Sequence, residues 1–349
     1  MERFDGLAEP ERLRDCFEIV RACVPVDEPG MPPWSFGSFT TKWAHGWSTD
    51  PRETWLGFDA AGQPAGCYLL TLPVSDNTSI GQVVLRVPPD RRRAGTGTAL
   101  LRHCAERARL ADRTRLRAEA WDGSAGAAFA AAAGASAGIP EVMRVLRLDN
   151  TNRDKVPGLR REAAAHAHDY SLLSWAGLTP EEHLQQVALV HAAMADAPRD
   201  ADVEESVWDA DRIRRIEQLM TAQGNVPYTV AARHEPTGEI AAVTTVLIDS
   251  DIPGWGFQQL TAVLANHRGH RLGLLVKARM LELLGEAEPD VGQILTGNAG
   301  SNDHMIAINA RLGFEVSRVG RAWELDLARF AEQESHLSGG TTPRIHRWC

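Results

Sequence analysis

The chain has 349 residues, which is enough for two domains of ordinary size. Hydrophobic residues make up 44% of it and charged residues 24%, the balance of a globular protein rather than a disordered or membrane-embedded one. The net charge of -9 argues against a general nucleic-acid binder, because such proteins present a basic surface. An acidic protein instead favours cationic or amine partners.

Five cysteines are present, an odd number with no CxxC spacing. We therefore expect reduced thiols, with no disulfide framework and no metal site. The first residues are charged and lack an apolar core, so we expect no signal peptide, and no run of 18 apolar residues suggests a membrane span. These features predict a cytoplasmic protein that does not contact a membrane.

In the first half, apolar residues at helical spacing predict a helix over residues 9–24, followed by a loop rich in Pro and Trp. Strands are expected at 55–58, 65–72 and 82–87. A basic turn over 91–97 then opens a helix with Leu100, Cys104 and Ala108 on one stripe. A strand over 114–121, an alanine-rich helix over 125–133 and a strand over 142–148 complete this half.

The polar, weakly patterned stretch 150–167 is the expected junction. It gives domains over residues 1–158 and 159–330 and a polar tail over 331–349. The second half repeats the same order, with expected helices at 181–193, 211–221 and 304–311, strands at 228–233, 239–248, 259–264, 294–296 and 323–327, and a second basic turn over 267–273 that opens a further helix. The sequence therefore predicts two α/β units, each with a mixed sheet and helices on its faces.

Each basic turn joins a strand to a helix, and this context suits an anion. A helix N-terminus carries unpaired N–H groups and partial positive charge, and glycines let the backbone approach phosphate oxygens. Arginines on the same turn add charge-assisted bonds. Neither turn has the third glycine of a dinucleotide-binding turn or the GK[ST] end of a P-loop. The pattern that remains is arginine-led and fits a pyrophosphate.

At these residues the chain resembles the GNAT superfamily of acyl-CoA-dependent N-acetyltransferases, whose turn reads [QR]-x-x-G-x-[GA] after the fourth strand. Two copies in one chain are similar in layout to mycothiol synthase, in which one half is catalytic and the other degenerate. The resemblance implies two GNAT folds in tandem, acetyl-CoA as co-substrate and no metal. In the second copy Arg271 replaces the middle glycine, which leaves the phosphates less room. The coenzyme contacts it implies are Leu85, Val87, Arg92, Arg93, Ala94, Gly95, Thr96, Gly97 and Thr98 in the first half, and Val263, Arg268, Gly269, His270, Arg271, Leu272 and Gly273 in the second.

The family also carries N-x-x-A-x-x-L-Y-x-x-x-G-F on the next helix, where the Asn bonds the pantetheine arm and the Tyr often protonates the leaving thiolate. In the second half Asn302 matches the Asn, and Asn309 stands at the Tyr position. In the first half these positions fall on Gly123 and Ala130. The usual acid is thus missing from both halves, so either the thiolate leaves unaided or another residue serves. The better second motif favours the C-terminal half as the catalytic one.

The chemistry implied is direct attack of a neutral amine on the thioester, which needs positioning, polarisation of the carbonyl and a proton acceptor. A backbone N–H near Val87 or Val263 would polarise the carbonyl, as in the family. Glu119 and Asp196 are candidate bases, although each also fits an ordinary surface carboxylate. His267 and His270 are expected to contact coenzyme, and the Trp-rich segment 34–47 is a candidate wall of the substrate cleft.

The expected partners are coenzyme A and a small-molecule amine acceptor, with no nucleic acid and no membrane. We expect a monomer that forms an internal pseudo-dimer, or a homodimer. Two other functions stay open at this point. One is an acyl-CoA-binding protein without transferase activity, since neither half keeps the Tyr, and the other is a protein or peptide N-acetyltransferase.

Overall fold

The computed structural model describes residues 1–6, 8–32, 34–46, 50–196, 204 and 207–339. The strands are β1 (Glu2–Phe4), β2 (Arg52–Phe58), β3 (Pro64–Thr71), β4 (Ile80–Arg86), β5 (Arg115–Trp121), β6 (Ser136–Arg147), β7 (Tyr170–Ala176), β8 (Asn225–His234), β9 (Glu239–Asp249), β10 (Trp255–Val263), β11 (Gln293–Ala299) and β12 (Glu315–Asp326). The helices are α1 (Pro10–Asp27), α2 (Phe36–His45), α3 (Thr96–Leu110), α4 (Ala125–Ala132), α5 (Asn150–Ala164), α6 (Leu184–Ala192), α7 (Ala210–Ala222), α8 (Leu272–Ala287), α9 (Asp303–Leu312) and α10 (Leu327–Gly339), with 3-10 turns η1 (Pro89–Arg91), η2 (Glu181–His183), η3 (Ala193–Asp196) and η4 (Ala265–His267).

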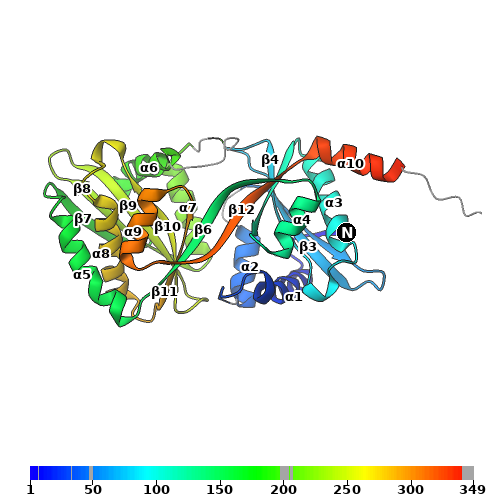
Figure 1. Cartoon of the computed structure of the whole chain (residues 1–349), viewed down its shortest axis with the longest axis horizontal. Helices are drawn as coiled ribbons and strands as arrows, with labels where there is room; N and C mark the ends of the chain where they lie inside the picture. The colour runs from blue at the N-terminus through cyan, green and yellow to red at the C-terminus, as the bar shows by residue number, and fades with distance from the viewer. Residues whose placement is uncertain (7, 33, 47–49, 197–203, 205–206, 340–349) are drawn as a thin grey trace, which may run out of the picture.

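The strands form one continuous mixed sheet in the order β1-β2-β3-β4-β5-β12-β6-β11-β10-β9-β8-β7. The two halves exchange their last strands at its centre. The first half's β6 pairs with β11 of the second, and the second half's β12 pairs with β5 of the first. Figure 1 shows these two long strands running side by side between the two lobes. Each lobe therefore borders a strand that comes from the other half of the chain.

Helices cover both faces of each lobe. In the first lobe, α3 packs on one face and α1 with α2 on the other. In the second lobe, α5, α8 and α9 share one core while α6 and α7 share the opposite one. The exchange reaches into these cores, because Leu325, Leu327 and Phe330 pack against α3, and Leu146 and Leu148 pack in the core of α8.

Further contacts tie the lobes beside the exchanged strands. Lys42 of α2 forms a buried ion pair with Asp249 at the end of β9, and Ser38 also accepts a bond from the lysine. Gln223, just after α7, donates to the carbonyl of Gly46. A buried charge that loses its partner costs several kcal/mol, so the Lys42–Asp249 pair specifies how the lobes meet.

The Trp-rich segment was expected to be a loop, but it contains helix α2. The side chain of Ser35 caps this helix by accepting the N–H of Ser38 at 3.0 Å. Trp43 is buried and stacks on Phe39 with ring centroids 4.9 Å apart. This tryptophan is thus core packing rather than a cleft wall, and Trp47 lies outside the described residues.

The stretch 150–167, in which we place the junction, is largely helical. Residues 150–164 form helix α5, capped by Asp149 and packed along α8, so the expected boundary at residue 158 falls inside a helix. The tail expected from residue 331 begins within α10, because Leu327 and Phe330 pack in the first lobe and hold the start of that helix. Residues 340–349 lie outside the described residues. The domain limits 1–158 and 159–330 remain a prediction.

In the described part of the chain, no helix has the length and hydrophobicity needed to cross a membrane. No group of three or more potential metal ligands gathers there either. Cys16, Cys23, Cys67 and Cys104 are buried free thiols, and Cys104 lies in the core of α3 as its helical stripe predicted.

Candidate functional site

The two basic turns have the same backbone conformation, residue for residue. Arg92 and Arg268 are extended, with φ of -73° and -70°. Two left-handed residues follow in each turn, at Arg93 (φ 64°) and Gly95 (φ 86°) in the first, and at Gly269 (φ 91°) and Arg271 (φ 55°) in the second. The glycine has changed places between the turns, and Arg271 adopts the left-handed conformation for which Gly95 is suited.

The helices that follow the two turns start without a side-chain cap. Neither α3 nor α8 receives a hydrogen bond from its N-cap side chain, whereas α4 and α9 are capped by Ser124 and Asn302. Among the described residues, no N-cap side chain therefore accepts from the first amides of α3 and α8, and uncapped helix N-termini of this kind are able to bind phosphate.

Beside each turn, two parallel strands separate. β4 pairs with β5 only over Ile80–Gln82, although the strands continue to Arg86 and Trp121. β10 pairs with β11 only over its first three residues, and a register shift follows at Gln258. We call the openings between these strands the first wedge and the second wedge. Each wedge begins beside a basic turn and leads into the sheet.

In the first turn, Arg92 and Arg93 differ. Arg92 points inward, where it binds both carboxylate oxygens of Asp27 at 3.0 and 2.6 Å and donates to the carbonyl of Val87 at 3.0 Å. Asp27 raises the pKa of Arg92, and its charge is neutralised within the fold. Arg93 is exposed and has no partner among the described residues. Its side chain is therefore available to a phosphate.

In the second turn, carboxylates of the protein already pair with two of the basic residues, Arg271 and His267. Arg271 pairs with Glu162 of α5, which also pairs with Arg311 of α9. His267 is buried between Glu239 and Tyr170, with N–O distances of 2.8 Å to each, so it braces the turn rather than facing a coenzyme. The exposed His270 stays available.

The remaining residues expected to contact coenzyme lie as follows. Leu85 and Val87 pack partly buried against the core of α3, and Val263 against that of α8, so their backbones rather than their side chains face the wedges. Ala94, Gly95, Arg268 and Gly269 are exposed, while Thr96, Gly97 and Thr98 are half-buried and Leu272 and Gly273 are buried.

The interiors of the two wedges differ in chemistry. Lys277, the sixth residue of α8, is 2% exposed, and its Nζ donates to Oε1 of Gln258 at 3.1 Å. Burial lowers the pKa of Lys277 to about 7. The corresponding residues of the first half, Leu101 and Val83, are apolar and share one core cluster. We did not anticipate Lys277 from the sequence, although a lysine on an otherwise apolar helix was a visible signal.

In both halves, a polar side chain at the start of the second motif caps the helix that follows it. Asn302 caps α9 by accepting the N–H of Met305 at 3.2 Å, and Ser124 caps α4 in the same way. The counterpart of Asn302 is therefore Ser124 rather than Gly123. Asn309 is fully buried; its Nδ2 donates to Asn298 at 2.7 Å, and its Oδ1 has no partner within the described residues. An amide has no titratable proton, so Asn309 can position groups but cannot replace the tyrosine as an acid.

The structure does not bring the candidate bases together. Glu119 is exposed on β5 opposite Ala322 of β12, at the centre of the sheet. Asp196 ends η3 in the second half, and its side chain lies outside the described residues. Burial, and secondly the charge of Glu119, raises the pKa of Glu141 on β6. A pair of carboxylates therefore lies at the exchanged strands.

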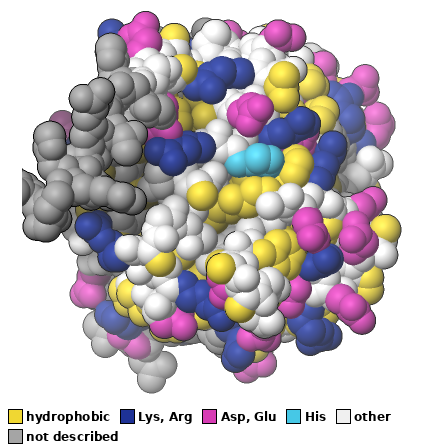
Figure 2. Space-filling model, turned by 90° about the vertical axis from the view of Figure 1, so that its right-hand side faces the viewer, with side chains coloured by type: hydrophobic (Ala, Val, Ile, Leu, Met, Phe, Trp, Pro, Cys, Tyr) yellow, Lys and Arg dark blue, Asp and Glu magenta, His cyan; other side chains and the backbone are white. Residues whose placement is uncertain are grey.

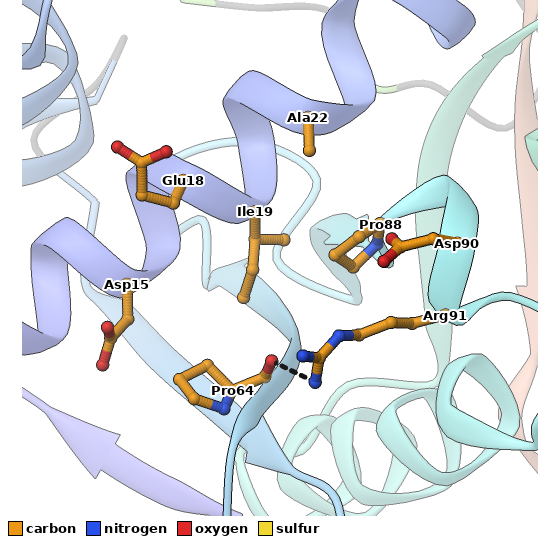
Figure 3. A pocket seen from close by; sticks show the side chains of 8 residues that line it. All are labelled: Asp15, Glu18, Ile19, Ala22, Pro64, Pro88, Asp90 and Arg91. Atoms are coloured by element: carbon orange, nitrogen blue, oxygen red, sulfur yellow. Dashed lines mark hydrogen bonds between the residues drawn. The ribbon is translucent and has the colours of Figure 1, made fainter.

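A hollow of about 280 Å³ lies between α1 and η1 (Figure 3). Arg91 reaches across it to the carbonyl of Pro64 at 2.9 Å, and Asp15, Glu18 and Asp90 surround it. Arg91, at the start of the first basic turn, lines it, whereas residues 92–98 do not.

Figure 2 shows the end of the molecule formed by the N-terminal lobe. Over the part of this face that the structure describes, basic, acidic and apolar side chains are interspersed. The face therefore presents no continuous basic stripe of the kind that tracks a nucleic-acid backbone.

No protein-family model and no curated protein sequence matches the chain. Its fold is similar to that of a tandem GNAT protein from the clavulanic acid biosynthesis pathway, solved without AcCoA. The TM-score is 0.76 at 28% identity, and the match covers 93% of this chain and 97% of that one. A GCN5-related N-acetyltransferase from Sphaerobacter thermophilus aligns with a TM-score of 0.65 at 14% identity, over 91% and 93% of the two chains. The glucosamine N-acetyltransferase region of a fungal multi-domain β-N-acetylglucosaminidase aligns with a TM-score of 0.64 at 14% identity, over 93% of this chain and 38% of that one.

Proposed function

We propose that this chain, whose fold is that of tandem GNAT proteins, transfers an acetyl group from acetyl-CoA to the amine of a small molecule. The observation that carries the proposal is the combination of an uncapped helix N-terminus, a left-handed basic turn and a separating strand pair in one place. The turn suits the diphosphate, and the wedge suits the pantetheine arm that ends in the thioester.

We place the coenzyme in the first half, although the second motif in the sequence favoured the other. In the second turn the carboxylate of Glu162 already pairs with Arg271, and a phosphate would have to compete with it. In the second wedge, Lys277 and Gln258 form a polar contact at the place where the first wedge has the apolar pair Leu101 and Val83. The first turn keeps Gly95 and an unpaired Arg93.

In this site the residues of the chain position the coenzyme and polarise the thioester carbonyl. The amides of residues 93–98 hold the diphosphate, and the part of β4 beyond Gln82 presents backbone groups that do not pair with β5. The amine attacks the thioester carbon, the C–N bond forms, the C–S bond breaks, and the proton lost by nitrogen balances the thiolate released. With an unperturbed thiol pKa of about 8.5, the thiolate leaves without an obligatory acid.

Two substitutions at matched positions test the coenzyme site. Ala94 and His270 are both exposed and occupy the same place in their turns, so Ala94→Glu and His270→Glu each add a carboxylate without altering a glycine. In calorimetric titrations with acetyl-CoA, Ala94→Glu is expected to weaken binding by about tenfold or more, roughly the effect of one unfavourable charge near a phosphate. His270→Glu is expected to leave binding unchanged. The reverse pattern would place the coenzyme in the second half, and absence of binding by the wild type would refute the proposal.

The absence of the family tyrosine from both motifs supports a second candidate, an acyl-CoA-binding protein without transferase activity. Thiol release during incubation of acetyl-CoA with a broad amine panel separates the two functions.

For the assembly we propose a cytoplasmic monomer in which the halves form an internal pseudo-dimer, because their strands already complete each other's sheets. Light scattering after gel filtration tests this state.

A further inference from the structure

Strand exchange places an arginine of the second half at the first wedge. Trp121 is the last residue of β5, at the open end of the wedge, and it pairs with Gly320 of β12. Two residues earlier on β12, Arg318 lays its guanidinium over the Trp121 ring, with its carbon 4.1 Å from the ring centroid. A register shift just before Arg318 accompanies this placement.

Two nitrogen donors of the Arg318 guanidinium have no acceptor among the described residues. Its Nε and Nη1 are buried and have no hydrogen-bond partner within the described residues. Burial lowers the pKa of Arg318, and the neighbouring charge that opposes this effect is Glu28, which already accepts a bond from Arg86 at 2.7 Å. Buried donors without acceptors are costly, and a bound water, ion or ligand can supply the acceptor.

At the matching place of the second wedge, the described residues include no such group. Glu141 occupies on β6 the place that Gly320 has on β12, because it pairs with Ala299 at the end of β11 as Gly320 pairs with Trp121. Two residues earlier, Ile139 stands where Arg318 stands on the other strand. The arginine and the tryptophan beneath it therefore belong to the first wedge specifically.

We propose that Arg318 binds a carboxylate of the acceptor, so that the substrate is an amine that also carries a carboxylate, as an amino acid does. Nε or Nη1, each together with Nη2, forms a fork that can bind a carboxylate through two parallel hydrogen bonds, and stacking on Trp121 fixes the plane of the guanidinium. Glu119 lies two residues before Trp121 and so faces the same side of the sheet, where its charge suits the ammonium end. The product is an N-acetyl amino acid whose carboxylate is unchanged.

This inference rests on the proposed function, and matched substrate pairs test it. The probes are L-lysine with cadaverine, L-histidine with histamine, and L-phenylalanine with phenethylamine, each with acetyl-CoA. Thiol release gives kcat/KM, and the shift of Tm with coenzyme A present reports binding. In at least one pair the wild type is expected to prefer the amino acid by about tenfold or more, and Arg318→Gln to abolish that preference.

Arg321→Gln is the matched control, because Arg321 lies on the same strand but is paired with both oxygens of Asp122 at 2.9 Å. This variant is expected to keep the preference, and Arg318→Lys to keep part of it. The inference is overturned if no pair shows a preference by either readout, if Arg318→Gln retains it, or if that variant weakens both members of a pair equally. Titration of acetyl-CoA separates the two proposals, since loss of coenzyme binding by the wild type refutes the function itself, whereas intact binding without a carboxylate preference refutes only this inference.

Discussion

The two lobes share one backbone plan but differ in the contacts made at its key positions. In the first, the turn keeps an unpaired arginine and the wedge is apolar inside. In the second, Glu162 pairs with the turn and a buried lysine lies in the wedge. The two lobes thus share main-chain geometry while their side-chain chemistry differs, and this difference supports our proposal that the first lobe takes the coenzyme.

Replacing Lys277 is expected to have the largest effect on stability. The pKa of Lys277 is lowered from 10.5 to about 7, so below pH 7 the lysine is charged in both states and the fold bears the full cost of burying it, up to about 5 kcal/mol. Above pH 10.5 it is neutral in both states and the cost vanishes. Lys277→Met leaves Gln258 without its donor, which costs about 1–3 kcal/mol, so a net gain of about 2–4 kcal/mol is expected at pH 6.

Urea denaturation of wild type and Lys277→Met at pH 6 and pH 9.5 measures this effect. Stability of the wild type is expected to rise with pH between about 7 and 10.5, where the unfolded state binds the extra proton, and the gain of the variant is expected to shrink over the same range. A gain that is independent of pH would contradict the buried-charge explanation. Leu101→Lys places the same charge in the first wedge and is expected to destabilise the protein.

Truncation of Leu325 tests whether the exchanged strand supports the lobe that it joins. This residue belongs by sequence to the second half but packs, 5% exposed, in the core of α3. Leu325→Ala is expected to cost about 2–4 kcal/mol through the cavity that it leaves. Hydrogen exchange of the α3 amides measures where the loss is felt, and unchanged protection of α3 would show that the exchange is not structurally important.

Gly95 and Arg271 hold the same left-handed position in their turns. Substitutions at this position are therefore expected to change stability by smaller amounts, with opposite signs in the two turns. Arg271 has φ 55° and Gly95 φ 86°, conformations that cost a side chain roughly 1 kcal/mol. Arg271→Gly is therefore expected to raise stability slightly or leave it unchanged, while Gly95→Arg lowers it by about 1 kcal/mol. Thermal unfolding of both variants provides the comparison, and destabilisation by both would indicate that the Arg271–Glu162 pair outweighs the strain.

The smallest expected effect concerns anion binding at the second turn. Glu162→Gln removes the carboxylate that pairs with Arg271 and Arg311 and frees both arginines. Inorganic pyrophosphate is expected to bind the variant a few-fold more tightly than the wild type, because an exposed ion pair is worth at most about 1 kcal/mol. Arg161, the preceding residue on α5, offers a control in Arg161→Gln. Equal affinity in all three proteins would show that Glu162 does not compete for the turn.

Much of this architecture could be predicted from local patterns. The turns, the helices after them and the two-fold repeat follow from glycine, arginine and apolar spacing, which are local properties. The strand exchange could not, because β6 and β12 satisfy the same alternation whichever sheet they join. Helix α2 was missed because its cap, Ser35, lies among prolines and tryptophans that are typical of a loop. Arg318 was missed because its relation to Trp121 arises only when the two halves combine.

The exchange of β6 and β12 also bears on how such a chain can be divided. A cut between β6 and α5 would give two pieces, each of which carries a strand that the other lacks. Neither piece would close its own sheet, so each would present an open edge and aggregate unless its complement were present. The pieces are therefore expected to behave as a complementing pair, in which the second half supplies a strand, and with it Arg318, to the first.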